Sequence, residues 1–266
     1  MQLSLPPFGW DLAKEAAKYL VVAAAGWVLN SGKRWWGTRP ARAFWHPFIS
    51  DDLRLVVGHF EQFRLFERSG VIGVGDAIAL GELQRYLAQI GARDPKVVYD
   101  NRLEGDDLKH TIIALGGPDA NEVTRGAVKQ IDSKLRFGDP EVDKNAIVIR
   151  DTTSDPPRLY NPDPLDRDGA GTDFGLILRA PNPYAPEKEM MIIAGSFGHG
   201  TWAATRYVIS PAFLALREAK AQGPLECLVK TEVVRDTPQA IHLIVARSIR
   251  CGAIRMNRPT PPAART

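Results

Sequence analysis

The sequence predicts an α/β fold, a three-layer sandwich around a mostly parallel sheet, with an antiparallel hairpin at its C-terminal end and a hydrophobic helix before the domain. Two observations lead to this fold class. Short apolar runs alternate with helical patterns over residues 53–131, a spacing typical of parallel strands joined by right-handed crossovers. Farther along the chain, two stretches of alternating hydrophobicity flank the turn-forming residues 235–239, which predicts the hairpin.

The composition excludes several classes of protein. The 266 residues include 34 Lys and Arg against 31 Asp and Glu, a net charge of +3, with 24% charged and 44% hydrophobic residues. This is the balance of an ordinary globular chain, and it offers no electrostatic basis for binding nucleic acid. Two cysteines exclude a disulfide scaffold and a multi-cysteine zinc module. A mean hydropathy of -0.19 excludes a protein with many membrane spans.

The first half of the domain contains three short apolar runs, at residues 53–60, 96–100 and 111–117, which are predicted strands. Between the first two, residues 79–91 carry an apolar face at helical spacing, made of Leu80, Leu83, Leu87 and Ile90. A second helix is predicted over residues 120–131. Either Asp119 or Asn121 caps its start, because both side chains can accept hydrogen bonds from the first helical amides.

The second half is predicted to be richer in strands. Short strands are expected within residues 145–151 and 158–163, followed by a loop of turn residues over 161–173. Longer apolar strands follow at 174–183 and 189–197, and a helix begins at Thr201. The hairpin strands cover 225–234 and 240–249. If Val234 lies opposite Ala240, Cys227 faces Arg247 and Cys251 falls opposite Gly223, so the two cysteines are expected to be unpaired.

Four segments divide the chain: a hydrophobic helix in 1–37, a linker rich in proline and aromatic residues in 38–52, the Rossmann-like domain in 53–252 and a loose tail in 253–266. Residues 19–29 are all apolar or glycine, and the stretch reaches eighteen residues, near the roughly 20 of a bilayer-spanning helix, only when it is counted from Leu12 with three charged residues included. Basic residues follow them, which would place the large domain in the cytoplasm. The other interpretation is a helix packed on its own domain or on a partner, in a soluble cytoplasmic protein.

Three glycine-containing loops mark where a ligand could bind, since open α/β sheets bind ligands beyond the carboxyl ends of their strands. They cover residues 73–77, 114–121 and 194–204. The first lacks the third glycine of a dinucleotide fingerprint, although Asp100 ends the next strand where such a fold places its ribose-binding acid. The alternative is that these glycines only serve tight turns. The candidate ligand-binding residues are Gly75, Asp76, Asp100, Gly116, Gly117, Asn121, Gly198, His199, Gly200 and Thr201.

The ligand crevice is expected between the loops at 114–121 and 194–204, with the loop at 73–77 at its rim. Free amides and dipoles at the starts of two helices favour an anionic group there. A Gly117→Val substitution is expected to abolish ligand binding with little effect on the fold. A Gly169→Val substitution, in the acidic loop, is expected to affect neither ligand binding nor the fold. Glycines packed under other segments, with no cavity, would favour a purely structural role.

No catalytic or metal site is predicted. Ser196 lies in GSFG, which differs from the G-x-S-x-G turn of hydrolases. The five histidines lack the spacing of a zinc site, and the aspartates of the loop at 161–173 do not match a calcium-binding loop.

The segments GVGDAIALGELQRYL, KVVYDN, ALGGPDAN, DFGLILRAPNP and MMIIAGSFGHGTWAA together resemble Rossmann-like domains of archaeal surface-layer proteins and of uncharacterised prokaryotic relatives. The resemblance covers roughly residues 53–249. It implies an α/β domain with a structural or ligand-sensing use and no settled catalytic residues. The chain departs from that group in its N-terminus, which has no evident cleavable signal and suggests an anchored single domain.

The expected function is that of a non-enzymatic accessory or ligand-sensing protein. Its N-terminal helix would tether it to a membrane or a membrane-protein complex, and its ligand would be a small anion. The alternative is an enzyme acting on a nucleotide or sugar nucleotide, with Asp76, Asp100, Asn121 and His199 as its polar groups. The sequence identifies no cofactor.

Overall fold

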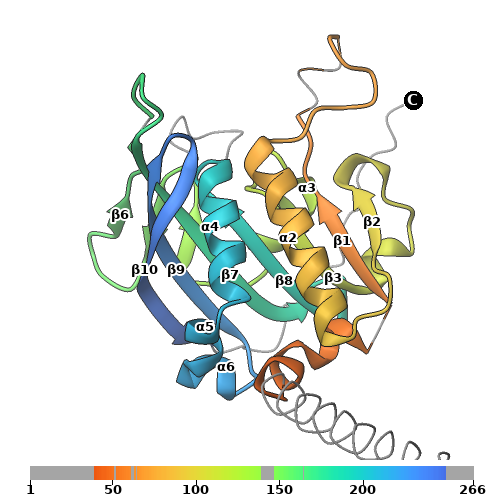
Figure 1. The fold of residues 1–266 in the computed structure, drawn as a ribbon. Helices are drawn as coiled ribbons and strands as arrows, with labels where there is room; N and C mark the ends of the chain where they lie inside the picture. Colours follow the sequence, from red (N-terminus) through yellow and green to blue (C-terminus); the bar gives the residue numbers. More distant parts are fainter. Residues whose placement is uncertain are drawn as a thin grey trace, which may run out of the picture.

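A computed structural model describes residues 39–50, 52–60, 63, 65–138, 147–163 and 165–249. Its centre is a seven-stranded sheet with the strand order β10-β9-β7-β8-β3-β1-β2 (Figure 1). The strands are β1 (Leu53–Val57), β2 (Lys96–Tyr99), β3 (Thr111–Leu115), β7 (Gly171–Asn182), β8 (Ala185–Gly195), β9 (Leu225–Val234) and β10 (Thr237–Ser248).

The sheet is mixed, and most of its strands point the same way. Strands β2, β1, β3 and β8 pair in parallel. Strand β7 is antiparallel to both β8 and β9, and β10 is antiparallel to β9. Five of the seven strands therefore share one direction, which confirms the predicted mostly parallel sheet with an antiparallel C-terminal hairpin. The antiparallel part is larger than predicted, because β7 and β8 form a long hairpin of their own.

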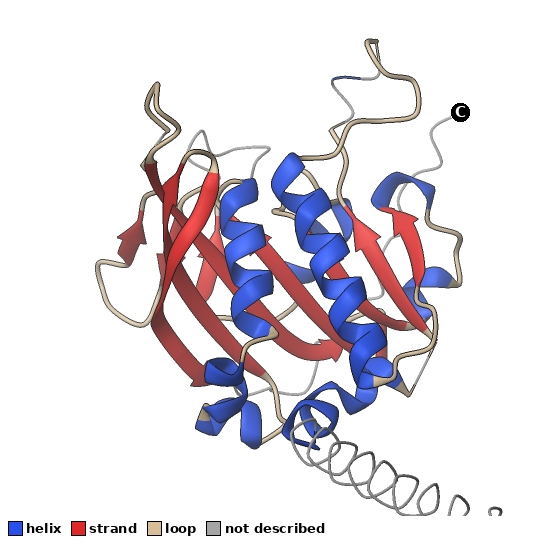
Figure 2. Cartoon of the chain, viewed as in Figure 1, coloured by secondary structure: helices blue, strands red, loops and turns tan. Residues whose placement is uncertain are grey.

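Two layers cover the two faces of the sheet (Figure 2). One face packs against α2 (Val74–Ile90), α4 (Gly198–Val208), α5 (Pro211–Ala215), α6 (Arg217–Lys220) and a helix over 39–49. The other face is covered by α3 (Glu122–Val128) and by a three-stranded antiparallel sheet of β4 (Leu135–Phe137), β5 (Ile149–Asp151) and β6 (Arg158–Tyr160). Two 3-10 turns, η2 (Asp100–Arg102) and η3 (Asp107–Lys109), lie between β2 and β3.

The core follows the two-residue period of the central strands. In β8, Met191 and Ile193 belong to the apolar cluster under α2 and α4, whereas Met190 and Ile192 belong to the cluster on the opposite face. Strands β1 and β3 are buried along their whole length. Such strands read as continuous apolar runs because both faces are covered.

Residues 39–49, predicted to belong to a linker, form a helix that contributes to the core. Ala41, Phe44, Trp45 and Phe48 follow the i, i+3, i+4, i+7 spacing of one helix face, and all four are buried. The ring of Phe44 lies 5.0 Å from that of Phe213, and the ring of Trp45 lies 5.7 Å from that of Tyr86. The domain therefore begins before residue 53.

The C-terminal hairpin has a tighter turn than predicted. Arg235 and Asp236 have φ angles of 50° and 55° and form a two-residue turn, so Thr237 rather than Ala240 lies opposite Val234. This register places Ala246 opposite Cys227, not Arg247. Two-residue turns with positive φ match the twist of the flanking strands.

The predicted hydrophobic helix in 1–37, the tail in 253–266 and Cys251 lie outside the described residues. Cys227 is buried and free. None of the helices in the described ranges has both the length and the hydropathy needed to cross a bilayer.

Candidate functional site

The three glycine-containing loops meet at the carboxyl ends of β3 and β8, as predicted. A Cβ atom on Gly75, at the start of α2, would lie 2.1 Å from the carbonyl oxygen of Gly198, at the start of α4. A Cβ atom on Gly117, after β3, would lie 3.2 Å from the carbonyl oxygen of Gly195, at the end of β8. The contact at Gly75 requires glycine, because any side chain would separate the two backbones, whereas the contact at Gly117 is tight.

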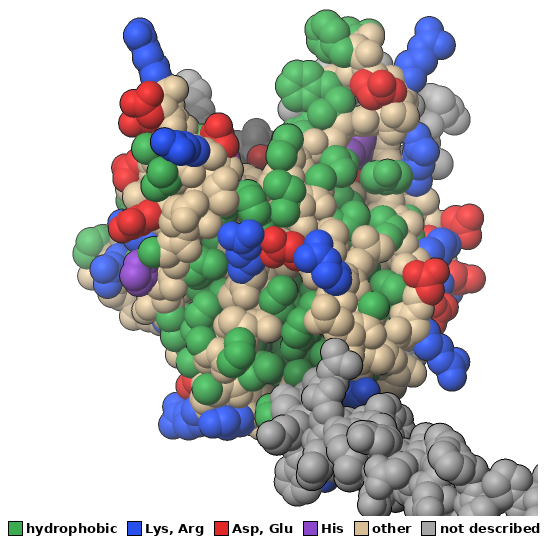
Figure 3. Space-filling model, viewed as in Figure 1, with side chains coloured by type: hydrophobic (Ala, Val, Ile, Leu, Met, Phe, Trp, Pro, Cys, Tyr) green, Lys and Arg blue, Asp and Glu red, His purple; other side chains and the backbone are tan. Residues whose placement is uncertain are grey.

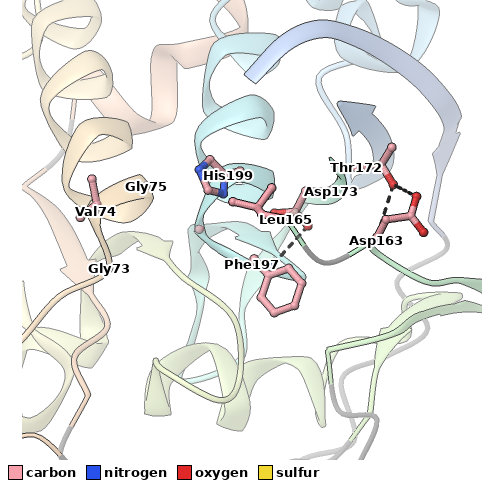
Figure 4. Close-up of a pocket in the computed structure, with 10 residues that line it drawn as sticks. Gly73, Val74, Gly75, Asp163, Leu165, Thr172, Asp173, Phe197 and His199 are labelled. Carbon is pink, nitrogen blue, oxygen red and sulfur yellow. Dashed lines mark hydrogen bonds between the residues drawn. The ribbon is translucent and has the colours of Figure 1, made fainter. Parts of the chain in front are cut away.

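A pocket of about 350 Å³ opens between two of these loops and the segment that enters β7 (Figure 4). The same end of the molecule is hollowed between two projections in the space-filling view (Figure 3). The lining residues are Gly73, Val74, Gly75, Asp163, Leu165, Thr172, Asp173, Phe197, Gly198 and His199.

One side of the pocket is built from the N-termini of α2 and α4. Their N-cap residues are Gly73 and Phe197, and no described side chain caps the first amides from either position. The first amides of a helix have no partner within it, and the helix dipole places partial positive charge at this end. Two such ends lie side by side here, because Gly75 and Gly198 let them touch. The backbone on this side of the pocket therefore carries partial positive charge, which Asp76, in the first turn of α2, and Asp173, at the Gly200 amide of α4, partly offset.

Asp173 lies at the base of the pocket with 2% of its surface exposed. Its carboxyl oxygens accept hydrogen bonds from the amides of Phe174 (2.7 Å), Phe197 (3.2 Å) and Gly200 (2.6 Å), so it ties β7 to the start of α4. Burial raises the pKa of Asp173 to about 7 despite these bonds, and the charge of Asp76 raises it further. Near neutral pH this carboxyl is about half ionised.

Asp76 lies directly behind the pocket wall, in the first turn of α2, and is 4% exposed. Its carboxyl accepts a hydrogen bond from the hydroxyl of Thr201, which itself accepts one from the amide of Gly195 at 2.9 Å. Its Oδ1 atom has no partner among the described residues. Burial raises the pKa of Asp76 to about 6, and the charge of Asp119 acts in the same direction.

The opposite side of the pocket carries polar side chains, Asp163 and Thr172, in place of helix ends. The Thr172 hydroxyl donates to Oδ2 of Asp163 at 2.6 Å, and the two residues face the helix ends across the pocket (Figure 4). His199 donates from Nε2 to the carbonyl oxygen of Asp236, in the hairpin turn, at 3.2 Å. The pocket thus has an anion-favouring side and a side that offers a carboxylate and a hydroxyl.

The pocket mouth carries exposed apolar side chains. Val74 is 77% exposed, Phe197 is 42% exposed and Leu165 is 37% exposed. All three line the pocket. Isolated exposed apolar residues are ordinary, but a group of them around a cavity is typical of a surface that a ligand or partner covers.

Of the predicted site residues, Gly75, Gly198 and His199 line the pocket. Asp76, Gly200 and Thr201 are buried behind its wall. Gly116 and Gly117 lie in the loop after β3, which does not line this pocket. The described cavity is therefore not between the loops at 114–121 and 194–204, as predicted, but between those at 73–77 and 194–204.

The loop after β3 is closed by its own hydrogen bonds. Asn121 is fully buried and caps α3 by accepting from the amides of Val123 (3.0 Å) and Thr124 (3.1 Å). Its amide group also donates to the carbonyl oxygens of Val56 and Leu115. The Thr124 hydroxyl donates to the carbonyl oxygen of Gly116 at 3.0 Å.

Asp100 has a structural position away from the pocket. It lies 2.5 Å from Nδ1 of His59 and accepts a hydrogen bond from the Glu122 amide at 2.8 Å. It thus joins the end of β1, the end of β2 and the start of α3.

Two substitutions expected to leave the fold intact would disturb it. A side chain on Gly117 would meet Asp119 at 2.6 Å as well as the backbone of Gly195. Gly169 has a φ angle of +68°, and a Cβ there would lie 3.0 Å from the Asp236 amide. Valine at either position would therefore strain the structure, so neither variant separates binding from folding.

Sequence reasoning missed Asp173 and Phe197 as parts of the site. Asp173 is one of several aspartates in a turn-rich segment, and only its place directly before the buried apolar residues 174–178 of β7 distinguishes it. Within the described ranges, no group of three or more His, Cys, Asp or Glu side chains is arranged to hold a metal ion.

A scan of the sequence against models of protein families gives no match, and a search of curated proteins gives none either. The resemblance to surface-layer domains therefore rests on the sequence motifs alone.

Proposed function

We propose that this protein is a non-enzymatic ligand-sensing protein that binds a small anionic molecule in the pocket between α2 and α4. The observation that carries the proposal is the apposition of two helix N-termini at one cavity. Each contributes partial positive charge, and helix ends bind phosphate and carboxylate groups in this way.

The charges around the pocket are compatible with an anion. Asp173 directs its oxygens to three backbone amides and is about half ionised near neutral pH, because burial raises its pKa to about 7. Asp163 lies on the far side, paired with Thr172. The carboxyls closest to the helix ends are Asp76, in the first turn of α2, and Asp173, and burial raises the pKa of both, so that each is protonated more readily than an exposed carboxyl and opposes an anion less.

The alternative function, an enzyme acting on a nucleotide or sugar nucleotide, needs Asp76, Asp100, Asn121 and His199 to converge on one substrate. Only His199 lines the pocket. Asp100 and Asn121 hold β1, β2, β3 and α3 together through buried hydrogen bonds. This separation favours a binding protein over an enzyme built on those four groups.

We also propose that residues 1–37 tether the protein to a membrane or a membrane-protein complex, with the folded domain in the cytoplasm. The chain enters the described domain in the helix over 39–49, at the end opposite to the pocket (Figure 1). A tether there leaves the pocket open to ligand. Deleting residues 1–37 is expected to move the protein from the membrane to the soluble fraction, and unchanged fractionation would contradict the tether.

Substitutions at Val74 test the binding proposal. This side chain is exposed at the first position of α2 and lines the pocket. A Val74→Asp substitution adds negative charge where it stabilises the helix, by about 0.3–1 kcal/mol, and where it repels an anion. Val74→Lys has the opposite charge and serves as the matched control.

The full-length variants would be titrated at low salt, by calorimetry, with inorganic phosphate, pyrophosphate, ribose 5-phosphate and nucleoside phosphates. We expect at least one to bind, with affinity lowered roughly tenfold by Val74→Asp and raised by Val74→Lys. Absence of binding, or binding indifferent to the charge at position 74, would exclude the pocket as an anion site.

A further inference from the structure

The loop between β1 and α2 carries the two most exposed large apolar side chains among the described residues. Leu65 is 93% exposed and Phe66 is 85% exposed, and Phe63 beside them is partly exposed. Figure 1 shows this loop reaching beyond the carboxyl end of the sheet, next to the start of α2. Neighbouring apolar side chains with so little cover are typical of a surface that binds another molecule.

Hydrogen bonds within the loop hold these side chains in one arrangement. The amides of Phe66 and Glu67 donate to the carbonyl oxygen of Phe63, at 2.9 and 3.1 Å. At the base of the loop, the Phe60 amide donates to the carbonyl oxygen of Val71 at 2.8 Å, and the ring of Phe60 lies 6.2 Å from that of Phe63. An apolar tip that is already ordered loses little conformational entropy when a partner covers it.

The same end of the molecule has an apolar hollow beside this loop. The loop adjoins the pocket, because a Cβ atom on Gly73, which lines the pocket, would lie 3.7 Å from the ring of Phe60. The exposed side chains of Val74, Leu165 and Phe197 surround the pocket mouth, and the space-filling view shows the hollow next to the projection (Figure 3). A projection and a hollow of the same apolar character on one face allow two identical copies to bind about a two-fold axis, because each copy supplies both halves of the contact.

We propose that two copies of this chain bind each other through this end of the molecule. Leu65 and Phe66 of each copy pack on the apolar mouth of the other copy's pocket, around Val74, Leu165 and Phe197. The contact occurs twice in the dimer, once on each side of the two-fold axis. It rests on exposed apolar side chains and is independent of the anionic ligand proposed above.

The exposed apolar area at this end is enough for a stable dimer. Val234 belongs to it as well, because the hairpin turn that follows this residue bonds to His199 of the pocket. Seven of the twelve large apolar side chains exposed among the described residues therefore lie here: Phe63, Leu65, Phe66, Val74, Leu165, Phe197 and Val234. At roughly 150–200 Å² for each residue when fully exposed, their exposed fractions correspond to about 700 Å² per copy, close to the roughly 800 Å² per partner of a standard interface.

The charges on the two halves complement each other. The loop carries the exposed Arg68, and the exposed Arg102 donates to the carbonyl oxygen of Ser69 at 3.4 Å. The carboxylate of Glu67 already accepts hydrogen bonds from the hydroxyl and the amide of Ser69. The segment before β7, across the hollow, has three exposed carboxylates and one exposed arginine: Asp163, Asp166, Asp168 and Arg167. In the two-fold arrangement the loop of one copy faces this segment of the other, so basic side chains approach acidic ones.

The dimer is compatible with the proposed tether. The described chain begins in the helix over 39–49, at the end opposite to the pocket (Figure 1). A two-fold axis perpendicular to the strands places one N-terminal segment at each end of an elongated dimer. Both segments can enter one membrane when the dimer lies along its surface.

Sedimentation of the full-length protein, in a density-matched detergent and over a range of concentrations, tests the dimer. We expect two chains of 29.3 kDa to associate at micromolar concentrations. Phe66→Asp is expected to raise the dissociation constant of the dimer at least hundredfold, because each dimer loses the contact twice. Leu159→Asp is the matched control, since Leu159 is also exposed but lies in β6 of the small sheet, and it is expected to leave the dissociation constant unchanged. Thermal unfolding midpoints equal to that of the wild type would establish that both variants are folded.

Cross-linking between two differently tagged chains tests which surfaces meet. Both chains carry Cys251→Ser, and Cys227 is buried and does not compete. One chain has Leu65→Cys and the other has Leu165→Cys, and mild oxidation of the mixture is expected to join them through a disulfide. A mixture of Leu65→Cys with Leu159→Cys is the control and is expected to give no such product.

Three outcomes would overturn the dimer. A protein that stays monomeric at high micromolar concentrations would leave this surface to a different protein. A dimer with the same dissociation constant in wild type and Phe66→Asp would place the contact elsewhere, for example in residues 1–37. Equal cross-linking of Leu65→Cys to positions 165 and 159 would show that the loop meets no defined surface. The anion site is measured separately by titration of a ligand, so either proposal can fail while the other stands.

Discussion

Gly75 is the residue that allows α2 and α4 to meet at the pocket. A methyl group there would lie 2.1 Å from the carbonyl oxygen of Gly198, whereas a methyl group on Gly81, two turns along the same helix, would contact nothing within 4 Å. Replacing each of these two glycines by alanine therefore distinguishes the effect of the close contact at Gly75 on stability from the general effect of a glycine within a helix.

Gly75→Ala is expected to lower the free energy of unfolding by about 1–3 kcal/mol, the usual cost of overpacking. Gly81→Ala is expected to raise it by about 0.5–1 kcal/mol, because alanine is the better helix former. Urea denaturation of the full-length variants measures both. Equal effects of the two substitutions would show that the helices do not touch at Gly75.

Asp76 makes stability depend on pH. Its folded-state pKa, raised by burial to about 6, exceeds the value of about 3.9 of an unfolded aspartate. Protonation therefore favours the folded state. The stabilisation is complete below about pH 4 and is lost as the pH rises through 6, when a charge must be held in a buried site with an unpartnered oxygen.

Asp76→Asn removes this charge. We expect the change in the free energy of unfolding caused by this substitution to be more favourable at pH 8 than at pH 4, by on the order of 1–3 kcal/mol. The exposed Asp168→Asn is the control, with no comparable difference between the two pH values. A variant that loses more stability at pH 8 than at pH 4 would show that the Asp76 carboxylate is stabilised by its surroundings.

Among the elements, the helix over 39–49 changes the boundary of the domain. The spacing of Phe44, Trp45 and Phe48 carries a helical signal, but the neighbouring prolines, Pro40 and Pro47, favour a linker when the segment is read alone. The contacts with Phe213 and Tyr86 decide in favour of the helix, and both partners are distant in the sequence.

Truncation tests that boundary. Removing residues 1–37 is expected to leave a folded domain, while removing residues 1–51 exposes the core under Trp45. Within the full chain, Trp45→Ala is expected to cost about 3–5 kcal/mol, and the exposed His46→Ala less than about 0.5 kcal/mol. Chemical denaturation followed by circular dichroism measures these differences. Equal stability of the two truncated proteins would show that residues 39–49 are a linker and do not stabilise the domain.

The sheet was predictable because its signals are local. β1 and β3 are short buried runs that are apolar apart from Arg54 and Thr111, and Asn121 caps α3 as one of two predicted residues. The pocket was only partly predictable. Gly75, Gly198 and His199 lie in segments with a recognisable glycine pattern. Thr172 and Asp173 are in β7, and Asp163 precedes it, so their positions depend on the pairing of β7 with β8 and β9.

At the scale of the whole molecule, Cys227 reports on unfolding. It is fully buried in β9, between Ile177 of β7 and Ala246 of β10, and burial raises the pKa of its thiol to about 12. At pH 8 the thiol is therefore both protonated and inaccessible. Opening of the sheet is required before a reagent reaches it.

In a Cys251→Ser variant, alkylation of Cys227 by iodoacetamide is expected to be orders of magnitude slower in the native protein than in urea. Its rate should rise with denaturant as steeply as global unfolding does. Rapid labelling of the native protein would mean that β9 opens locally, and that the hairpin is not an integral part of the domain.

The helix α2 connects the two ends of the molecule. Gly75, in its first turn, lines the pocket, and Tyr86, near its other end, packs against Trp45 of the helix over 39–49. With 17 residues at 1.5 Å each, α2 is about 25 Å long. An α-helix hardly changes length under small forces, so a displacement of one end along the helix axis also displaces the other end. A shift of α2 along its axis would therefore also move Tyr86 and its contact with Trp45, close to where the described part of the chain begins.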